Sequence, residues 1–257
     1  MANPRRGRGL PVGVLIGLPL LGAFGLILAL RGVFPPRDID ALVLDPAAVA
    51  GLCWAGQLLY VGHSLDPAQG PSRSWRRLFG LANVLTVSRG ALYAVVAGFV
   101  VVPPGTDLAW VPALAYGTGA LLDKIDGMVA RTVGGETELG ERLDMAFDTF
   151  GFVAAPLVAV LWGLLPAWYL SLSAARYVYR GGVAWRRHRG RPVFDAPDSD
   201  LGKYLAGVQM AFITLALAPA MPTDLVWTLA PFVLAPSLAV FARDFLVVSG
   251  RFHGREN

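Results

Sequence analysis

The chain has 257 residues, of which 55% are hydrophobic and 16% are charged, and its formal net charge is +4. Soluble domains carry about 25% charged residues, and the apolar residues here form runs of membrane-spanning length instead of amphipathic stripes. The composition therefore excludes an ordinary soluble domain and predicts an all-α integral membrane protein. The single cysteine, Cys53, excludes an intrachain disulfide. The arginines cluster at the ends of apolar runs, which argues against nucleic-acid binding.

The first 78 residues are predicted to form an N-terminal extension with about two transmembrane helices. A basic N-terminus precedes an apolar run from Leu10 to Leu30, which is too long for a signal peptide. A second, shorter run extends from Ala47 to Gly62. The polar segment that follows is rich in turn residues and is predicted to be an interfacial linker. We therefore expect domains at residues 1–78 and 79–257.

Six further apolar runs follow, and Pro or Gly residues, which stop helices, lie at the breaks between them. The predicted helices are 83–102, 108–130, 143–164, 167–185, 202–221 and 225–248. The arginines then predict the orientation of the chain, because cytoplasmic segments are enriched in them. Eight spans with both termini in the cytoplasm leave only Arg31 and Arg37 in the outer turns.

Four aspartates lie in the segment LLDKIDGMVARTVGGETELGERLDMAFDTF, at the predicted cytoplasmic ends of two neighbouring helices. Asp123 and Asp126 are three residues apart, and Asp144 and Asp148 are four apart, so each pair lies on one helical face. Four converging carboxylates repel one another unless a cation neutralises them. Oxygen ligands without His or Cys favour Mg²⁺ or Mn²⁺, and two such ions can hold a diphosphate. The alternative, helix-end acids solvated at the interface, is typical of a single aspartate.

The aspartates belong to a longer pattern. The residues Asp123-x-x-Asp126-Gly127-x-x-Ala130-Arg131, followed after eight residues by Gly140-x-x-x-Asp144-x-x-x-Asp148, resemble the signature of the CDP-alcohol phosphotransferases. The resemblance covers about residues 80–248 and implies the six-helix membrane core of that family. It also implies an enzyme that transfers a substituted phosphoryl group from a CDP-linked donor to an alcohol and releases CMP.

The resemblance implies roles for individual residues. The implied ligands of a two-metal Mg²⁺ or Mn²⁺ site are Asp123, Asp126, Asp144 and Asp148. Asp148 is also the implied catalytic base that deprotonates the acceptor alcohol. The implied contacts of the CDP moiety are Gly127, Ala130, Arg131 and Gly140.

The first core helix opens with Asn83, Thr86 and Arg89, spaced three apart. They resemble the N-x-L-T-x-x-R start of the family, which lies near the nucleotide site, and are therefore expected to bind CDP. The alternative is that Asn83 caps the helix and Arg89 pairs with an active-site aspartate. Under both interpretations Arg89 faces the polar site, because an ionised side chain within an apolar run needs a partner.

Three basic residues further along the chain are predicted to bind an anionic group on the acceptor: Arg176, Arg180 and Lys203. Lys203 lies in a stretch that resembles a Gly-Lys element common in family members that make anionic phospholipids. The alternative is that Arg176 and Arg180 extend to lipid phosphates at the membrane surface.

The expected donor is CDP-diacylglycerol, and the expected acceptor is a small polar alcohol, which would give a product of the phosphatidylglycerol phosphate or phosphatidylinositol phosphate type. One alternative is head-group transfer from a soluble CDP-alcohol to a lipid alcohol. Another is a divalent-cation transporter, although transport predicts acids near the middle of the bilayer on several helices. The family resemblance also implies a homodimer.

Overall fold

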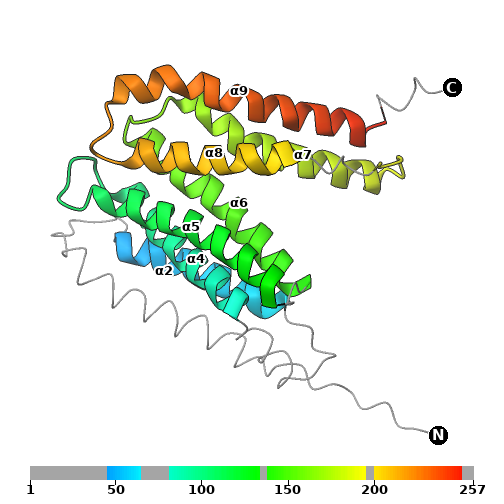
Figure 1. The fold of residues 1–257 in the computed structure, drawn as a ribbon, viewed down its shortest axis with the longest axis horizontal. Helices are drawn as coiled ribbons and strands as arrows, with labels where there is room; N and C mark the ends of the chain where they lie inside the picture. The colour runs from blue at the N-terminus through cyan, green and yellow to red at the C-terminus, as the bar shows by residue number, and fades with distance from the viewer. Residues whose placement is uncertain (1–44, 65–80, 134–137, 195–199, 251–257) are drawn as a thin grey trace, which may run out of the picture. The chain divides into compact units, whose positions relative to one another are not determined.

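The computed structural model describes residues 45–64, 81–133, 138–194 and 200–250, and all regular structure within these ranges is helical. In chain order the elements are α2 (Pro46–Ser64), α4 (Leu81–Gly98), η2 (Phe99–Val101), α5 (Trp110–Val133), α6 (Glu138–Leu161), η3 (Ala167–Leu170), α7 (Ser171–His188), α8 (Asp200–Leu217) and α9 (Thr223–Val248) (Figure 1). The all-α prediction is confirmed for these residues. The first predicted membrane helix and the predicted linker lie outside them.

Each of the six predicted core runs overlaps one of the helices α4 to α9, and α2 covers the second N-terminal run. The ends differ from the predicted ones: α6 begins at Glu138, within the polar segment, and not at residue 143. The run predicted to reach residue 164 stops as a helix at Leu161, because Gly163 adopts a φ of 73°. Leu164 N–H then donates to Ala159 O at 2.8 Å and Gly163 N–H to Val160 O at 3.0 Å, a Schellman motif that satisfies the last carbonyls of the helix.

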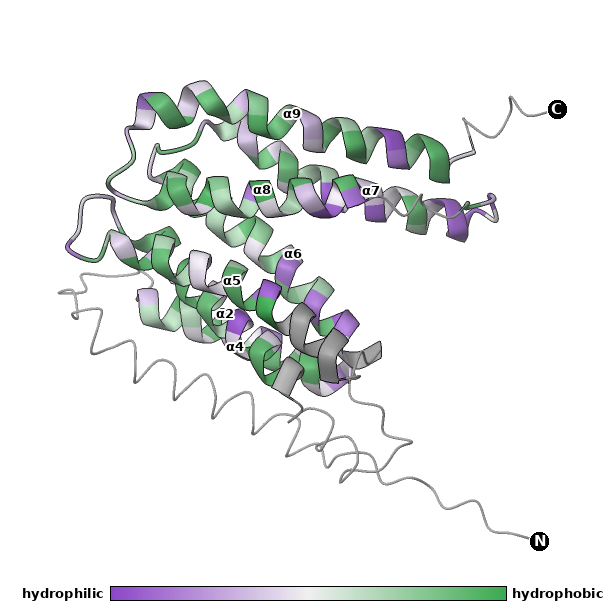
Figure 2. Ribbon diagram, viewed as in Figure 1, coloured by the Kyte–Doolittle hydropathy of each residue, from purple (hydrophilic) through white to green (hydrophobic). Residues whose placement is uncertain are grey.

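Three of the described helices contain stretches long and apolar enough to cross a membrane, namely Val84–Val101, Gly140–Leu161 and Thr223–Val248. They indicate an integral membrane protein. The other predicted spans, and the orientation of the chain, stay predictions. Figure 2 shows that hydrophilic residues gather in the N-terminal half of α6 and at the C-terminal end of α7, whereas the C-terminal half of α6 is hydrophobic.

The chain divides into two compact units at Ala154 and Ala155, within α6. In the first unit α2 packs along α4, and glycines on α4 allow the close approach. A Cβ at Gly98 would lie only 2.7 Å from Pro46 O, and a Cβ at Gly90 would overlap the Gln57 side chain. Val61 of α2 joins Leu143 and Phe147 of α6 in a buried apolar cluster. Within the described residues, α2 therefore packs against α4 and α6.

The second unit is held by a neutral polar cluster centred on Gln209 of α8, which is buried. The Gln209 amide donates to Val233 O at 2.8 Å and to Ser237 Oγ at 2.9 Å, both on α9. Its Oε1 accepts a hydrogen bond from the Tyr169 hydroxyl in η3. These hydrogen bonds connect three helical elements inside one unit.

Candidate active site

Arg89 lies at the centre of the candidate site, and its side chain is fully buried within α4. Its guanidinium forms close ion pairs with Asp123 and Asp144, and Nη2 lies 3.5 Å from Asp148 Oδ1. A buried charge is costly unless it is paired and hydrogen-bonded. The structure therefore gives Arg89 the partners that its position in an apolar run requires, and supports the ion-pair interpretation of this residue.

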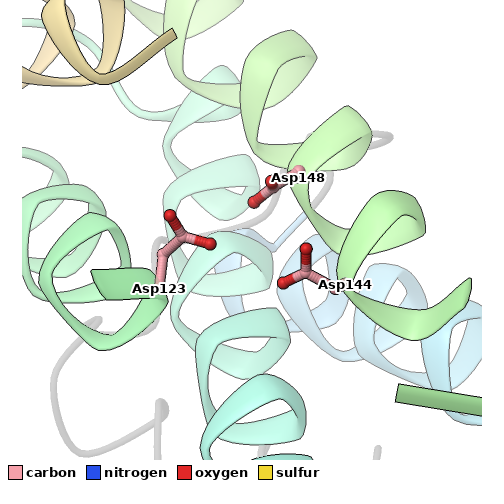
Figure 3. A group of neighbouring side chains, drawn as sticks. All are labelled: Asp123, Asp144 and Asp148. Carbon is pink, nitrogen blue, oxygen red and sulfur yellow. The ribbon is translucent and has the colours of Figure 1, made fainter. Parts of the chain in front are cut away.

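The three aspartates converge from two helices. Asp123 comes from α5, Asp144 and Asp148 come from α6, and Figure 3 shows their carboxylates pointing toward one another. One oxygen of each carboxylate lies within 4.8 Å of the others. The side chains are 21%, 42% and 20% exposed, in that order, so solvent reaches the group.

This geometry fits a divalent cation. Among the described side chains, three carboxylates gather around one guanidinium, and converging carboxylates repel one another unless cations neutralise them. The donors are all oxygen atoms, the ligand type preferred by Mg²⁺ and Mn²⁺. The i, i+4 spacing of Asp144 and Asp148 places both on one face of α6, as the sequence predicts.

Several predicted residues can be placed only by their backbone. Asp126, Gly127, Ala130 and Arg131 lie on the last turns of α5, and Asn83 lies in the first turn of α4, but their side chains fall outside the described part of the structure. Gly140 lies near the start of α6. Thr86 is buried, one turn before Arg89 on α4.

The residues predicted to bind the acceptor lie in the second unit, whereas the three aspartates and Arg89 lie in the first. Arg176 is half-buried and Arg180 is exposed, one turn apart on α7. Lys203 on α8 is exposed, and its Nζ lies 4.0 Å from Oδ1 of Asp200, which is also exposed. Their predicted role stays a prediction.

Tyr93 belongs to none of the predicted site residues, and its side chain lies fully buried one turn beyond Arg89 on α4. The ring contacts Gly119 of α5 and Gly151 of α6. A signal was present in the spacing: Tyr93 is four residues from Arg89, Gly119 four from Asp123, and Gly151 three from Asp148. Each of these residues therefore shares a helical face with a charged residue of the site.

Comparison with known proteins identifies the family. A family model described as CDP-alcohol phosphatidyltransferase matches residues 79–252. The chain belongs to the CDP-alcohol phosphatidyltransferase family. The comparison with curated proteins gave no match.

Members of the CDP-alcohol phosphatidyltransferase family are membrane transferases of substituted phosphate groups in phospholipid biosynthesis. The chain is therefore an enzyme that transfers a phosphoryl-alcohol group from a CDP-alcohol to an alcohol acceptor. The family generally uses divalent metals, and the aspartate cluster fits such an ion. Membership of a transferase family, and the position of these three acids in one cluster on two helices, argue against the transporter alternative.

Proposed function

We propose that the donor is CDP-diacylglycerol and that the acceptor is a small phosphorylated alcohol, with a product of the phosphatidylglycerol phosphate or phosphatidylinositol phosphate type. The observation that carries the proposal is the cluster of Asp123, Asp144 and Asp148 around Arg89. This cluster lies in a chain that matches the transferase family over residues 79–252. A lipid donor suits an enzyme whose helices include membrane-spanning stretches, because the acyl chains can remain in the bilayer.

The metal ligands in this proposal are Asp123, Asp126, Asp144 and Asp148. A bound pair of Mg²⁺ or Mn²⁺ ions would neutralise the negative charge of the diphosphate. Phosphoryl transfer depends mainly on such charge neutralisation and on positioning. Arg89 holds Asp123 and Asp144 in place through its ion pairs, so that the carboxylates are oriented before a ligand binds.

Asp148 is the proposed catalytic base. Its Oδ1 lies 3.5 Å from Arg89 Nη2, and its side chain is 20% exposed, so the carboxylate is partly open to solvent. Asp148 takes the proton of the acceptor hydroxyl as the acceptor oxygen forms a bond to the phosphorus that carries the lipid alcohol. The bond from that phosphorus to the CMP oxygen breaks, and CMP leaves with the bonding electron pair.

The remaining contacts follow the family pattern. The proposed CDP contacts are Asn83, Thr86, Gly127, Ala130, Arg131 and Gly140. The proposed contacts of the acceptor phosphate are Arg176, Arg180 and Lys203, since guanidinium and ammonium groups bind phosphate oxygens strongly. We also propose that the site opens to the cytoplasm, where the positive-inside rule places the arginine-rich loops, and that the enzyme is a homodimer.

The test is a CMP-release assay with the purified full-length protein in lipid nanodiscs. It compares CDP-diacylglycerol with a soluble CDP-alcohol plus diacylglycerol, each with Mg²⁺ or Mn²⁺. The acceptors for CDP-diacylglycerol are glycerol phosphate, inositol phosphate, inositol and serine. We expect release of CMP with CDP-diacylglycerol and a phosphorylated acceptor. Release only with the soluble CDP-alcohol and diacylglycerol would contradict the proposed donor and assign the enzyme to head-group transfer.

A further inference from the structure

We propose that Tyr93 is a positioning residue for the metal centre. Its ring fixes the separation of α5 and α6, and its hydroxyl forms a hydrogen bond to an aspartate ligand or to a water molecule held by one. The inference rests on the proposed function, because it assumes that the aspartates bind a divalent cation. It adds a residue to which the family signature in this sequence assigns no role.

Arg89, Asp123, Asp144 and Asp148 form a charged layer across α4, α5 and α6. Tyr93 lies about one helical turn from Arg89, in the next layer. Arg89 and Tyr93 share a face of α4. Gly119 precedes Asp123 by one turn on α5, and Gly151 follows Asp148 by nearly one turn on α6. Tyr93, Gly119 and Gly151 are in contact, so the three helices that carry the charged layer meet again at this tyrosine.

The ring of Tyr93 fills the space between two glycines. One ring edge faces Gly119, where an added Cβ would overlap Cε1 and lie 3.0 Å from Cζ. The opposite edge faces Gly151, where an added Cβ would lie 2.5 Å from Cε2 and 2.7 Å from Cδ2. Carbon atoms in contact are normally about 3.5–4.0 Å apart. The ring therefore fits only because neither helix has a side chain at these positions, and its width determines how closely α5 and α6 approach.

The hydroxyl of Tyr93 is fully buried and has no hydrogen-bond partner among the described residues. Buried polar groups are normally paired, and an unpaired one calls for an explanation. Helical side chains lean toward the N-terminus of their helix, so the Tyr93 side chain leans toward the turn that carries Arg89. Donation to a ligand carboxylate, or to a water molecule held there, would satisfy it. Such outer hydrogen bonds orient metal ligands and increase metal affinity.

Tyr169 provides a matched comparison in the second unit. It is also fully buried, but its hydroxyl donates to Gln209 Oε1 in a neutral cluster. Replacement of Tyr169 by Phe removes a satisfied hydrogen bond and should lower stability without changing metal affinity. Replacement of Tyr93 by Phe removes a hydroxyl that has no partner among the described residues and keeps the ring. It should lower metal affinity without lowering stability.

The experiment measures Mn²⁺ binding to the full-length protein by electron paramagnetic resonance and thermal melting in chelator. For Tyr93→Phe we expect the Kd for Mn²⁺ to rise about tenfold, the lower end of the effect of losing an outer hydrogen bond. The melting temperature in chelator should stay the same or rise. Tyr169→Phe should lower the melting temperature at unchanged Kd. Equal Kd values for Tyr93→Phe and the unmodified protein would overturn the role of the hydroxyl.

The spacing role of the Tyr93 ring is tested by substituting the glycines that it contacts on α5 and α6. For Gly119→Ala and Gly151→Ala we expect Kd to rise about a hundredfold, because the new methyl group pushes α5 and α6 apart and displaces the ligands. Gly56→Ala is the control, since a Cβ at Gly56 meets nothing within 4 Å. Unchanged Mn²⁺ affinity in both Gly119→Ala and Gly151→Ala would overturn the spacing role. Absence of Mn²⁺ binding to the unmodified protein would instead contradict the proposed metal centre itself.

Discussion

Each of the two units buries a polar cluster between its helices, and the two clusters differ in charge. In the second unit Gln209 joins Tyr169, Val233 and Ser237 through neutral hydrogen bonds in which donors meet acceptors. In the first unit the Arg89 guanidinium faces three carboxylates that solvent partly reaches. The hydrogen bonds of the Gln209 cluster join neutral groups, whereas the Arg89 cluster brings three like-charged carboxylates together.

The difference in charge indicates that one polar cluster stabilises the fold and that the other binds a ligand. A satisfied neutral cluster gains little from a ligand, so its contribution is to hold α8, α9 and η3 together. Bringing like-charged carboxylates together among apolar helices is costly, and binding a cation reduces that cost. Perturbing the first cluster should therefore change catalysis and metal dependence, and perturbing the second should change only stability.

The largest expected effect is on the proposed base. Asp148→Asn should lower the rate of CMP release by about 10²- to 10⁴-fold, the usual contribution of a general base. CDP binding should be largely retained, because the other proposed ligands remain. Single-turnover kinetics and calorimetric CDP titration measure the two quantities. Asp200→Asn, at an exposed aspartate of the second unit, is the control. Near-normal turnover in Asp148→Asn would remove its assigned role.

A smaller effect is expected for the residue that holds the acids. Arg89→Gln removes the buried guanidinium and leaves the carboxylates to repel one another. Breaking a buried ion pair costs about 3–5 kcal/mol of folding free energy. We expect a lower melting temperature in chelator and partial recovery with Mn²⁺, which replaces the lost positive charge. A loss of stability that Mn²⁺ does not reduce would show that the cluster does not bind the ion.

The neutral cluster should respond differently. Gln209→Leu removes three interhelical hydrogen bonds, and in membranes such bonds contribute about 0.6 kcal/mol each and up to about 1.7. We expect a lower melting temperature of equal size in chelator and in Mn²⁺. The Mn²⁺ concentration for half-maximal CMP release should not change. A shift in that concentration would contradict the division between the clusters.

The smallest expected effect concerns the packing of α2 on α4. In Gly98→Ala the new methyl group meets Pro46 O, and overpacking costs about 1–3 kcal/mol. The higher helix propensity of Ala offsets about 1 kcal/mol. We expect a net loss of about 1 kcal/mol for Gly98→Ala in chemical unfolding. Gly56→Ala on α2, where a Cβ meets nothing within 4 Å, should be neutral or stabilising. Equal stability of the two variants would argue against close packing of α2.

The sequence predicts the acid cluster well because helical periodicity is a local property. The spacing of Asp144 and Asp148 fixes their common face, and the short distance in sequence between α5 and α6 brings Asp123 near them. The need of Arg89 for a partner follows from its apolar surroundings. The identity of that partner could not be chosen from the sequence, since CDP and an aspartate both satisfy a guanidinium.

Contacts that depend on the distance between helices could not be predicted. The spacing places Gly119 and Gly151 on the same helical faces as Asp123 and Asp148, but it does not show that the ring of Tyr93 fills the space between them. The end of α6 was also missed, because the φ of 73° at Gly163 stops the helix while the apolar run continues. In the same way, the charges of Arg176, Arg180 and Lys203 suggest a phosphate site without showing which groups they face.

The most direct test of the central claim is a joint Mn²⁺ titration of the metal-stripped enzyme in nanodiscs, with bound Mn²⁺ and CMP release measured on the same samples. The account predicts that both rise together, and that Asp123→Asn and Asp144→Asn shift both curves to higher Mn²⁺ by at least about tenfold. Full CMP release in chelator, or unchanged Mn²⁺ binding in both variants, would contradict a metal centre at these aspartates.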